Sequence, residues 1–392
     1  MNDTNTIVRV AARGEGVTAD GRHIAFAAPG DVLRGDGTVA PGPHHQVPPC
    51  RHFPQCGGCQ LQHLDDAAWS GFLTDRIAGA LAAHGLETVI RPPALSPPRT
   101  RRRATLHAEP SGRVGFAAEK SHAIVDLAEC HVLAPELFAL VAPLRRLIHV
   151  LRPGRRLDLH LTLADQGVDL LVTGMMPEGL KAAEAITDFA QQHALARIAF
   201  DEGYGPEVRW EPDAVTVTLG GIPVPLPPAS FLQATREGEA ALVAAVREAV
   251  GDAGTIADLF AGLGTFAFAL PGRIYAAEGA RDALMALKAA AGRTQRLVFA
   301  EHRDLYRRPL TPAELDRFAA VVIDPPRAGA RDQAEALAGA KVPRLAYVSC
   351  NPSSFARDVK IMVEGGWRLD WVQPVGQFRW STHVELAAAL SR

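Results

Sequence analysis

The chain of 392 residues lacks any apolar run that approaches the roughly 18 residues of a membrane-spanning helix. Its first residues lack the charged and apolar regions of a secretory signal peptide. It also has little net charge, −2 at pH 7, which argues against non-specific polyelectrolyte binding to nucleic acid. We therefore expect a cytoplasmic protein without a membrane partner. A nucleic-acid partner would have to be held in one local basic groove.

Cysteine is scarce, and its five positions are unevenly placed. An odd count in a reducing compartment argues against a disulfide framework. Four thiolates are the number that completes a tetrahedral zinc site or holds a four-iron cluster, and the spacing alone does not decide between them. The sequence therefore predicts a metal site in the N-terminal third and leaves Cys350 over; the four candidate ligands are Cys50, Cys56, Cys59 and Cys130.

Composition places the chain among ordinary globular proteins, with 47% hydrophobic and 21% charged residues. Gly- and Pro-rich residues 1–49 predict a small appendage with strand-like stretches at Ile7–Ala11 and Ile24–Ala27. Residues 50–98 hold the cysteine loop, a helix that Asp65 and Asp66 open and that runs to about His84, and a proline-rich linker over 92–98. Residues 99–234 mix strands with helices near Pro135–Leu151 and Glu178–His193, which predicts an α+β domain.

From residue 235 to 392 short apolar runs alternate regularly with helical segments. This rhythm predicts a parallel sheet covered on both faces, an α/β doubly wound fold whose ligands lie at the carboxyl ends of the strands. The expected strands are Ile256–Phe260, Ile274–Glu278, Leu297–Ala300, Ala319–Asp324, Leu345–Cys350, Arg368–Gln373 and His383–Leu390.

A glycine loop follows the first strand of this region, within Asp258–Phe266. Gly262 and Gly264 allow a tight turn and a close approach of the backbone to a ligand. Ala267 stands where a dinucleotide fingerprint has its third glycine, and no Gly-Lys-Ser/Thr follows. Glu278 ends the second strand, where an acid accepts hydrogen bonds from a ribose diol. The loop by itself is compatible with a dinucleotide or with S-adenosylmethionine.

Two further motifs end the next parallel strands. Asp324-Pro325-Pro326-Arg327 is a stiff loop that resembles the Asp-Pro-Pro-aromatic motif of amino-group methyltransferases, but an arginine replaces the aromatic residue. Cys350 stands at the end of the following strand, just before a helix whose N-terminus would favour a thiolate. The structural alternative is a buried cysteine that acts as a small apolar side chain.

Polar residues near these motifs complete the candidate site. Strand alternation places Glu385 and His383 on one face, so that Glu385 could point into the cleft as a proton acceptor whose pKa is raised by desolvation. A basic segment before the α+β domain could bind phosphates, or could be a solvated charged loop; it consists of Arg99, Arg101, Arg102 and Arg103.

Taken together, these residues resemble the RNA uracil-C5 methyltransferase family, and most closely its bacterial members that act on 23S ribosomal RNA and carry an iron–sulfur cluster. The resemblance covers roughly residues 50–392. The matching stretches are Cys50–Gln60, Gly115–Phe116, Ser121–Asp126 with Cys130, Ser230–Gln233, Asp258–Phe266, Asp324–Gly329, Ser349–Pro352 and Thr382–Glu385. The family's larger members begin with a complete small β-barrel, of which residues 7–40 have room for only a fragment.

The resemblance implies a Rossmann-like class I methyltransferase domain and a specific reaction. Cys350 falls on the family's nucleophile, which adds to C6 of uracil, and Glu385 on the base that removes the C5 proton. Phe231 falls near the target base, and the four N-terminal cysteines fall on the ligands of a [4Fe-4S] cluster. The residues at S-adenosylmethionine contacts are Gln233, Phe260, Thr265, Glu278, Asp304 and Asp324.

The expected partner is RNA, most closely 23S rRNA, bound by a monomer. Three alternatives stay open. Transfer RNA could be the substrate instead of ribosomal RNA. A dinucleotide-dependent oxidoreductase would explain Gly262, Gly264 and Glu278 but leaves Cys350 without a role. A non-catalytic RNA-binding or metal-scaffold protein would explain the arginines and the four N-terminal cysteines, but not the C-terminal motifs.

Overall fold

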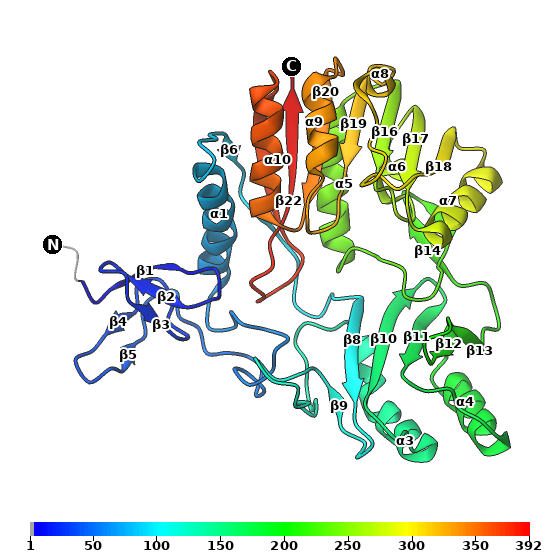
Figure 1. Ribbon diagram of the computed structural model, residues 1–392. Helices are drawn as coiled ribbons and strands as arrows, with labels where there is room; N and C mark the ends of the chain where they lie inside the picture. The colour runs from blue at the N-terminus through cyan, green and yellow to red at the C-terminus, as the bar shows by residue number, and fades with distance from the viewer. Residues whose placement is uncertain (1–3) are drawn as a thin grey trace.

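The computed structural model describes residues 4–392, so the first three residues of the expected appendage lie outside it. A large sheet with helices on both faces occupies the C-terminal part of the molecule, a second sheet with helices lies beside it, and small sheets form the N-terminal end (Figure 1). The predicted α/β fold class is confirmed.

The large sheet has nine strands, and its central strands are buried on both faces. Five strands run parallel, as the alternation of strands and helices predicts. The sheet is mixed, however, because β22 inserts antiparallel between β20 and β21. The order is β18 (Val298–His302), β17 (Arg273–Glu278), β16 (Thr255–Leu259), β19 (Ala320–Ile323), β20 (Arg344–Ser349), β22 (Glu385–Ser391), β21 (Arg368–Gly376) and β6 (Val89–Ile90), with β7 (Ala94–Leu95) also paired to β21.

Two sets of helices cover this sheet, and each builds its own apolar core. One face carries α1 (Asp66–Ala82), α8 (Pro312–Leu315), α9 (Arg331–Gly339) and α10 (Pro352–Glu364); the other carries α5 (Arg236–Val250), α6 (Thr265–Ala269) and α7 (Arg281–Thr294). The hairpin of β14 (Thr216–Leu219) and β15 (Ile222–Pro225) packs against α6 and α7.

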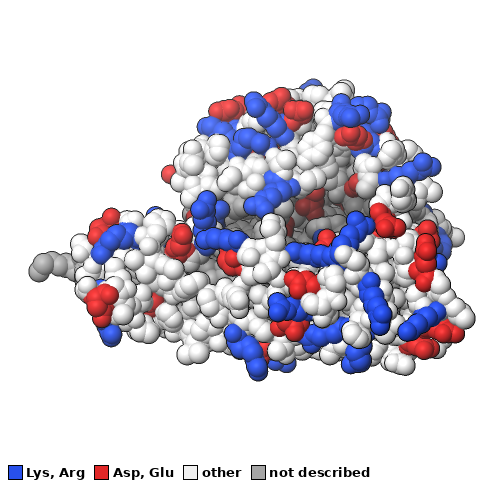
Figure 2. Space-filling model, turned by 60° about the horizontal axis from the view of Figure 1, so that its bottom comes forward, with Lys and Arg blue, Asp and Glu red and all other residues white. Residues whose placement is uncertain are grey.

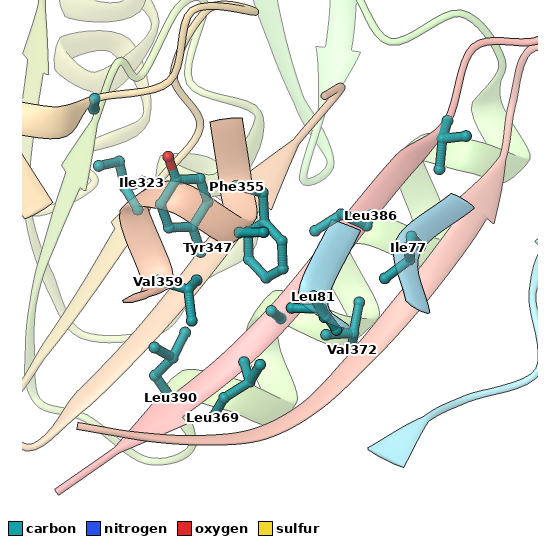
Figure 3. Close-up of a cluster of buried hydrophobic side chains, with 14 of the residues drawn as sticks. Ile77, Leu81, Ile323, Tyr347, Phe355, Val359, Leu369, Val372, Leu386 and Leu390 are labelled. Carbon is teal, nitrogen blue, oxygen red and sulfur yellow. The ribbon is translucent and has the colours of Figure 1, made fainter. Parts of the chain in front are cut away.

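Helix α1 belongs to this core although it lies far from it in the sequence. Asp65 caps the helix by accepting a hydrogen bond of 2.7 Å from the backbone N–H of Ala68. Apolar residues spaced three and four apart then face the sheet. Ile77 and Leu81 lie over Val372 and Leu386 (Figure 3). The predicted linker over 92–98 is wrong in part, because β7 lies within it and pairs with β21 at the sheet edge, just after β6 does the same.

The central sheet has six strands, and its inner face packs on three helices. Along β8 the side chains alternate between buried and partly exposed, so that Arg103 and Thr105 lie on the open face. The strands are β13 (Glu207–Trp210), β12 (Arg197–Asp201), β11 (Gly167–Thr173), β10 (Leu157–Ala164), β8 (Arg103–Ala108) and β9 (Val114–Gly115), and the helices are α2 (Pro135–Ala139), α3 (Val141–Leu151) and α4 (Leu180–Gln192).

The N-terminal segment forms two small antiparallel sheets. The predicted strand Ile24–Ala27 is wrong beyond Ile24, because Phe26 adopts a positive φ of 56° and the chain turns there. The first sheet contains β1 (Ile7–Val10), β2 (Gly16–Thr18) and β3 (His23–Ile24), and the second contains β4 (Val32–Leu33) and β5 (Val39–Ala40).

Candidate active site

Four of the predicted groups meet at one edge of the large sheet. Phe260, Asp324 and Cys350 follow directly after the parallel strands β16, β19 and β20, which are neighbours in the sheet. Ser349 pairs with Leu386 across β20 and β22, so the next position in the antiparallel register sets Cys350 opposite Glu385. The sequence predicts that Cys350 lies at this edge; the strand pairing adds Glu385 beside it.

A cavity of about 970 Å³ opens at this edge between the two sheets. Its size is at the upper end for small-molecule sites, enough for a cofactor together with a base. Figure 2 shows a hollow with acidic residues inside it and basic residues along its rim. The predicted residues that line the cavity are Arg101, Arg103, Phe231, Gln233, Phe260, Gly262, Thr265, Glu278, Asp324, Cys350 and Glu385.

Glu278, the last residue of β17, holds the glycine loop in its conformation. Glu278 accepts hydrogen bonds from the backbone N–H groups of Gly262 (2.8 Å) and Ala280 (2.6 Å), which ties the loop to the end of β17. Gly262 has a φ of +55° and faces the cavity. Gly264 has a different role, because a Cβ there would come within 2.7 Å of the Phe268 ring. Gly264 thus serves the packing of α6 and is absent from the cavity lining.

Asp304 is the second predicted cofactor contact that does not line the cavity. Its Oδ1 accepts hydrogen bonds from the backbone N–H groups of Tyr306 (3.0 Å) and Arg307 (3.2 Å), so it organises the turn after β18. The Tyr306 ring lies 5.5 Å from the ring of Phe260, which is held at a positive φ of 62°. This turn therefore supports Phe260 in the cavity wall, and the S-adenosylmethionine contact of Asp304 stays a prediction.

Helix α10 holds the Asp324–Arg327 loop in place. The backbone carbonyl of Arg327 accepts hydrogen bonds from Asn351 Nδ2 (3.0 Å) and Ser354 Oγ (3.1 Å). Deeper in the fold, buried Asp358 accepts hydrogen bonds of 2.7 Å from the Ala330 backbone N–H and from the Tyr347 hydroxyl. The loop that carries Asp324 is thus fixed to the helix that begins just after Cys350, which keeps the two groups in a constant relation.

Burial governs the protonation of the carboxyl groups here. It raises the pKa of Glu385 to about 8, with a further increase from Asp324, while a hydrogen bond from Gln377 opposes the shift. Burial also raises the pKa of Asp324 to about 7. Asp258, buried behind the cavity, has a pKa raised to about 8 by burial and by Asp324 and Glu278. Without a ligand, the site therefore holds protons on carboxyl groups near neutral pH.

The Cys350 thiol is also held in its protonated form. Burial raises its pKa to about 11, and the carboxyl groups of Glu385 and Asp324 add to that shift, while Arg327 lowers it. The helix N-terminus was expected to favour the thiolate, but in the unliganded chain burial is the larger influence on the pKa of Cys350. The two neighbouring acids and the loss of water outweigh the helix end.

The basic segment divides into exposed and buried parts. Arg102 is buried, and its guanidinium donates hydrogen bonds to Glu239 (2.5 Å) and to the backbone carbonyl of Gln233 (3.0 Å). It joins the central sheet to α5 and is not available to phosphates, so its prediction is corrected. Arg101 and Arg103 are partly buried and line the cavity, whereas Arg99 is exposed and is not among the lining residues. The Arg103 guanidinium lies 4.7 Å from the ring centre of Phe231, whose surface is 62% exposed.

All four N-terminal cysteines line one small cavity, and all are free thiols. Burial is the main cause that raises the pKa of each thiol, to about 12 for Cys59. Within residues 4–392, no three His, Cys, Asp or Glu side chains are close enough together to hold a metal ion. Gly58 and Phe116 line this cavity and the large one, so the cysteine loop forms part of the cleft wall.

Some residues of the site have no signal in the sequence. Thr105 and Phe378 line the cavity, and buried Gln377 contacts two of its residues. His383 also lines the cavity, and for this residue the sequence does give a signal. Strand alternation does place His383 with Glu385, although β22 begins only at Glu385. Nothing in composition or spacing distinguishes Gln377 from other polar residues, because its importance depends on a three-dimensional contact.

Comparison with known proteins supplies the family. Residues 230–392 match the sequence model of the tRNA (Uracil-5-)-methyltransferase family. An uncharacterized RNA methyltransferase of Zymomonas mobilis is 49% identical over 98% of this chain and 99% of its own length. The 23S rRNA (uracil(1939)-C(5))-methyltransferase of Halomonas elongata is 30% identical over 88% of this chain and 77% of its own length.

The chain belongs to the RNA uracil-C5 methyltransferase family. A solved structure with the same fold is the tRNA (uracil-54, C5)-methyltransferase of Pyrococcus abyssi in complex with S-adenosyl-L-homocysteine. It has a TM-score of 0.74 and 22% identity, and covers 98% of this chain and 99% of its own. This RNA methyltransferase has, over residues 4–392, no helix with the length and apolarity that crossing a bilayer requires.

The raised pKa of Glu385 predicts that this residue lowers the stability of the folded chain as pH rises. The folded chain keeps this proton up to about pH 8, whereas an unfolded chain loses it near pH 4. The free energy of unfolding therefore falls as pH rises between these values. Glu385→Gln removes that loss, so we expect it to gain at least about 1 kcal/mol over the parent chain between pH 5 and pH 8.5. Urea unfolding at both pH values measures this gain.

Glu202→Gln, at an exposed glutamate, is the control. If the free energy of unfolding changed with pH to the same extent in Glu385→Gln and in the parent chain, the raised pKa would be assigned to the wrong residue.

Proposed function

We propose that this enzyme transfers a methyl group from S-adenosylmethionine to C5 of a specific uridine in 23S rRNA through a covalent bond between Cys350 and uracil C6. The observation that supports the proposal most is the strand register that sets Cys350 opposite Glu385, with the Asp324 loop beside them. A thiol, a base and a stiff loop at the end of a large cavity are the parts that this reaction needs.

Part of the cavity suits the cationic cofactor. The part of the lining near the ends of β16 and β17 contains Phe260, Gly262, Thr265 and Glu278. Gln233 and Asp324 also line the cavity. Carboxylates around a cavity favour a positively charged ligand, and the Phe260 ring offers an apolar face. When bound, S-adenosylmethionine supplies an electrophilic methyl group. Its positive charge would also offset Asp324 and Glu385, which add to the effect of burial on the pKa of Cys350.

The chain's own groups account for the remaining chemistry. The Cys350 thiol gives its proton to water and its sulfur adds to C6, and the C5–C6 electron pair moves onto C5 and the C4 carbonyl, which makes C5 a nucleophile. After C5 has gained the methyl group, Glu385 removes the C5 proton. The C5–C6 double bond then re-forms as the bond from C6 to sulfur breaks, and Cys350 leaves as a thiolate.

RNA would approach from the rim of the cavity. Arg101 and Arg103 line the cavity and Arg99 is exposed on the same segment of the chain, and guanidinium groups in such positions can bind phosphates. The exposed ring of Phe231 offers a face on which an unstacked base can lie. A base must leave its stack to reach Cys350 inside the cavity. We assign this RNA-binding role to the central sheet and to the loop that carries Phe231.

Ribosomal RNA is the preferred substrate because of the Halomonas elongata relative, which is named for 23S rRNA. Transfer RNA is the second candidate, since the matching family model and the Pyrococcus abyssi structure are named for tRNA. An oxidoreductase or a non-catalytic scaffold would leave the pairing of Cys350 with Glu385 without a purpose.

We also propose that Cys50, Cys56, Cys59 and Cys130 bind a [4Fe-4S] cluster, with zinc as the alternative. The support is the donor set: four free thiols line one cavity, which is the ligand number of such a cluster. A thiolate is the form that binds metal, and burial, with a further contribution from the neighbouring cysteines, raises the pKa values of Cys56 and Cys59 and so favours the protonated thiols. A bound metal would reverse that preference.

The covalent step predicts a trapped complex. The protein is incubated with S-adenosylmethionine and RNA in which 5-fluorouridine replaces uridine, because fluorine at C5 cannot be removed as a proton. Denaturing gels and intact mass should show a protein–RNA adduct. Cys350→Ala should form none, whereas Glu385→Gln should still form one, since the base acts later. An adduct that survives in Cys350→Ala would refute the role of Cys350.

The substrate assignment predicts where 5-methyluridine disappears. Ribosomal and transfer RNA from a strain that lacks the gene are digested separately, and 5-methyluridine is measured by mass spectrometry. We expect the loss of one 5-methyluridine site from 23S rRNA, restored by the wild-type gene and not by the Cys350→Ala gene. A loss confined to tRNA would instead establish the tRNA candidate.

The cluster predicts iron, sulfide and a visible absorption band in protein purified without oxygen. We expect about four irons and four sulfides per chain, and a loss of both in serine variants of Cys50, Cys56, Cys59 or Cys130. Cys350→Ser is the matched control, because it removes the cysteine outside the group and should keep the colour. Stoichiometric zinc in a colourless protein would overturn the cluster in favour of the alternative.

A further inference from the structure

Gln377 is a buried amide that connects two sides of the site without lining the cavity. It follows directly after β21, which runs along the opposite side of β22 from β20. Its Nε2 donates hydrogen bonds to Gln233 Oε1 (2.7 Å) and to Glu385 Oε2 (3.0 Å), and its Oε1 accepts one from the backbone N–H of Ala234 (2.8 Å). One side chain therefore contacts both the loop that carries Gln233 and the candidate base.

The backbone contact fixes which way this amide points. A backbone N–H can only donate, so the atom of Gln377 that faces Ala234 must be the carbonyl oxygen. Both N–H donors of the amide then point to Gln233 and Glu385. Because Gln233 receives its bond on Oε1, its own Nε2 must point away from Gln377. The orientation of three polar groups thus follows from one buried amide.

Packing prevents Gln377 from turning. A Cβ added to Gly238 would lie 2.6 Å from the Cβ of Gln377, so α5 leaves no space beside it. Thr235 caps the same helix by accepting a hydrogen bond from Gly238 N–H. The contact with Glu385 is accordingly a fixed part of the fold, and rotation of the side chain cannot remove it easily.

We infer that Gln377 is a positioning residue that holds the Glu385 carboxylate toward the substrate and supports its ionised form for removal of the C5 proton. The inference rests on the proposed covalent mechanism, in which Glu385 acts after methyl transfer. A donor to a carboxylate favours the charged form, and here the bond from Gln377 lowers a pKa that burial and Asp324 raise. Among the other charged or titratable groups that line the cavity, the Cys350 thiol interacts electrostatically with Glu385 and with Arg327, and His383 interacts with Arg327 and Arg101.

The test separates formation of the adduct from its resolution. Gln377→Met keeps the side-chain length but removes both donors. Under single-turnover conditions with S-adenosylmethionine and unmodified 23S rRNA transcript, we expect normal adduct formation and a resolution step slower by roughly tenfold or more. Adduct should then accumulate on denaturing gels before 5-methyluridine appears. The acid limb of the rate of resolution against pH should move to higher pH, because the pKa of Glu385 rises.

Two further variants keep the test open to failure. Gln377→Glu keeps an acceptor for Ala234, and its like charge should move the acid limb further upward. Gln373→Met is the matched control, since it removes an amide from β21 that donates to the backbone carbonyl of Pro92 (2.8 Å), outside the cavity; its kinetics should match the parent protein.

The outcomes are distinct. Accumulated adduct together with a shifted pH profile supports the inference. A Gln377→Met protein that resolves its adduct like the parent, or that loses thermal stability and slows both steps equally with an unchanged pH profile, overturns it. Parent protein that traps no adduct with 5-fluorouridine RNA overturns the covalent mechanism itself, and this inference with it.

Discussion

The antiparallel register between β20 and β22 is the constraint on which the candidate site depends. Ser349 pairs with Leu386, and this pairing determines that the residue after β20 meets the first residue of β22. A slip by one residue would turn Glu385 to the other face of the sheet, away from Cys350. The register is held because the alternating residues of both strands pack into different cores, with Leu386, Ala388 and Leu390 on the side of α1 and α10 and Ala387 on the side of α5. Helix α1 thus stabilises the site from a distant part of the sequence.

The same region shows that the chain keeps groups which reduce its own stability. Asp324 and Glu385 have raised pKa values because they lie in a poorly hydrated space, and the Cys350 thiol beside them is protonated for the same reason. Such a cluster is unfavourable in an empty protein, since each added negative charge makes the next more difficult to form. A cationic ligand reverses this relation, because it favours ionisation of every group around it. The unliganded site therefore holds protons that binding of a sulfonium cation would release, because the cation favours the ionised forms of the thiol and the carboxyl group.

The sequence predicts strand-end chemistry well because a doubly wound sheet brings its strand ends to one edge whatever their order. Asp324 and Cys350 were identifiable for that reason. Arg102 was misassigned because a motif indicates a position and not the direction of a side chain: this arginine is buried and pairs with Glu239. Gly264 and Asp304 show contacts that a motif does not reveal, since the glycine makes room for Phe268 and the aspartate organises a turn. Gln377 could not be found at all, since three hydrogen bonds to distant residues define it. The insertion of β22 between β20 and β21 likewise leaves no mark on the pattern of apolar residues.

The cysteine loop also contacts parts of the site that are distant from it in the sequence. Gly58 and Phe116 separate the small cavity of the four thiols from the large cavity, and each contributes to both walls. A group bound by the thiols would order the loop from one side, while RNA in the cleft would contact it from the other. Gln60 and Leu61 donate backbone hydrogen bonds to the carbonyl of Trp380, in the segment between Gln377 and Glu385. The cysteine loop and the segment that leads to Glu385 are therefore joined directly, by two backbone hydrogen bonds that do not involve the sheet.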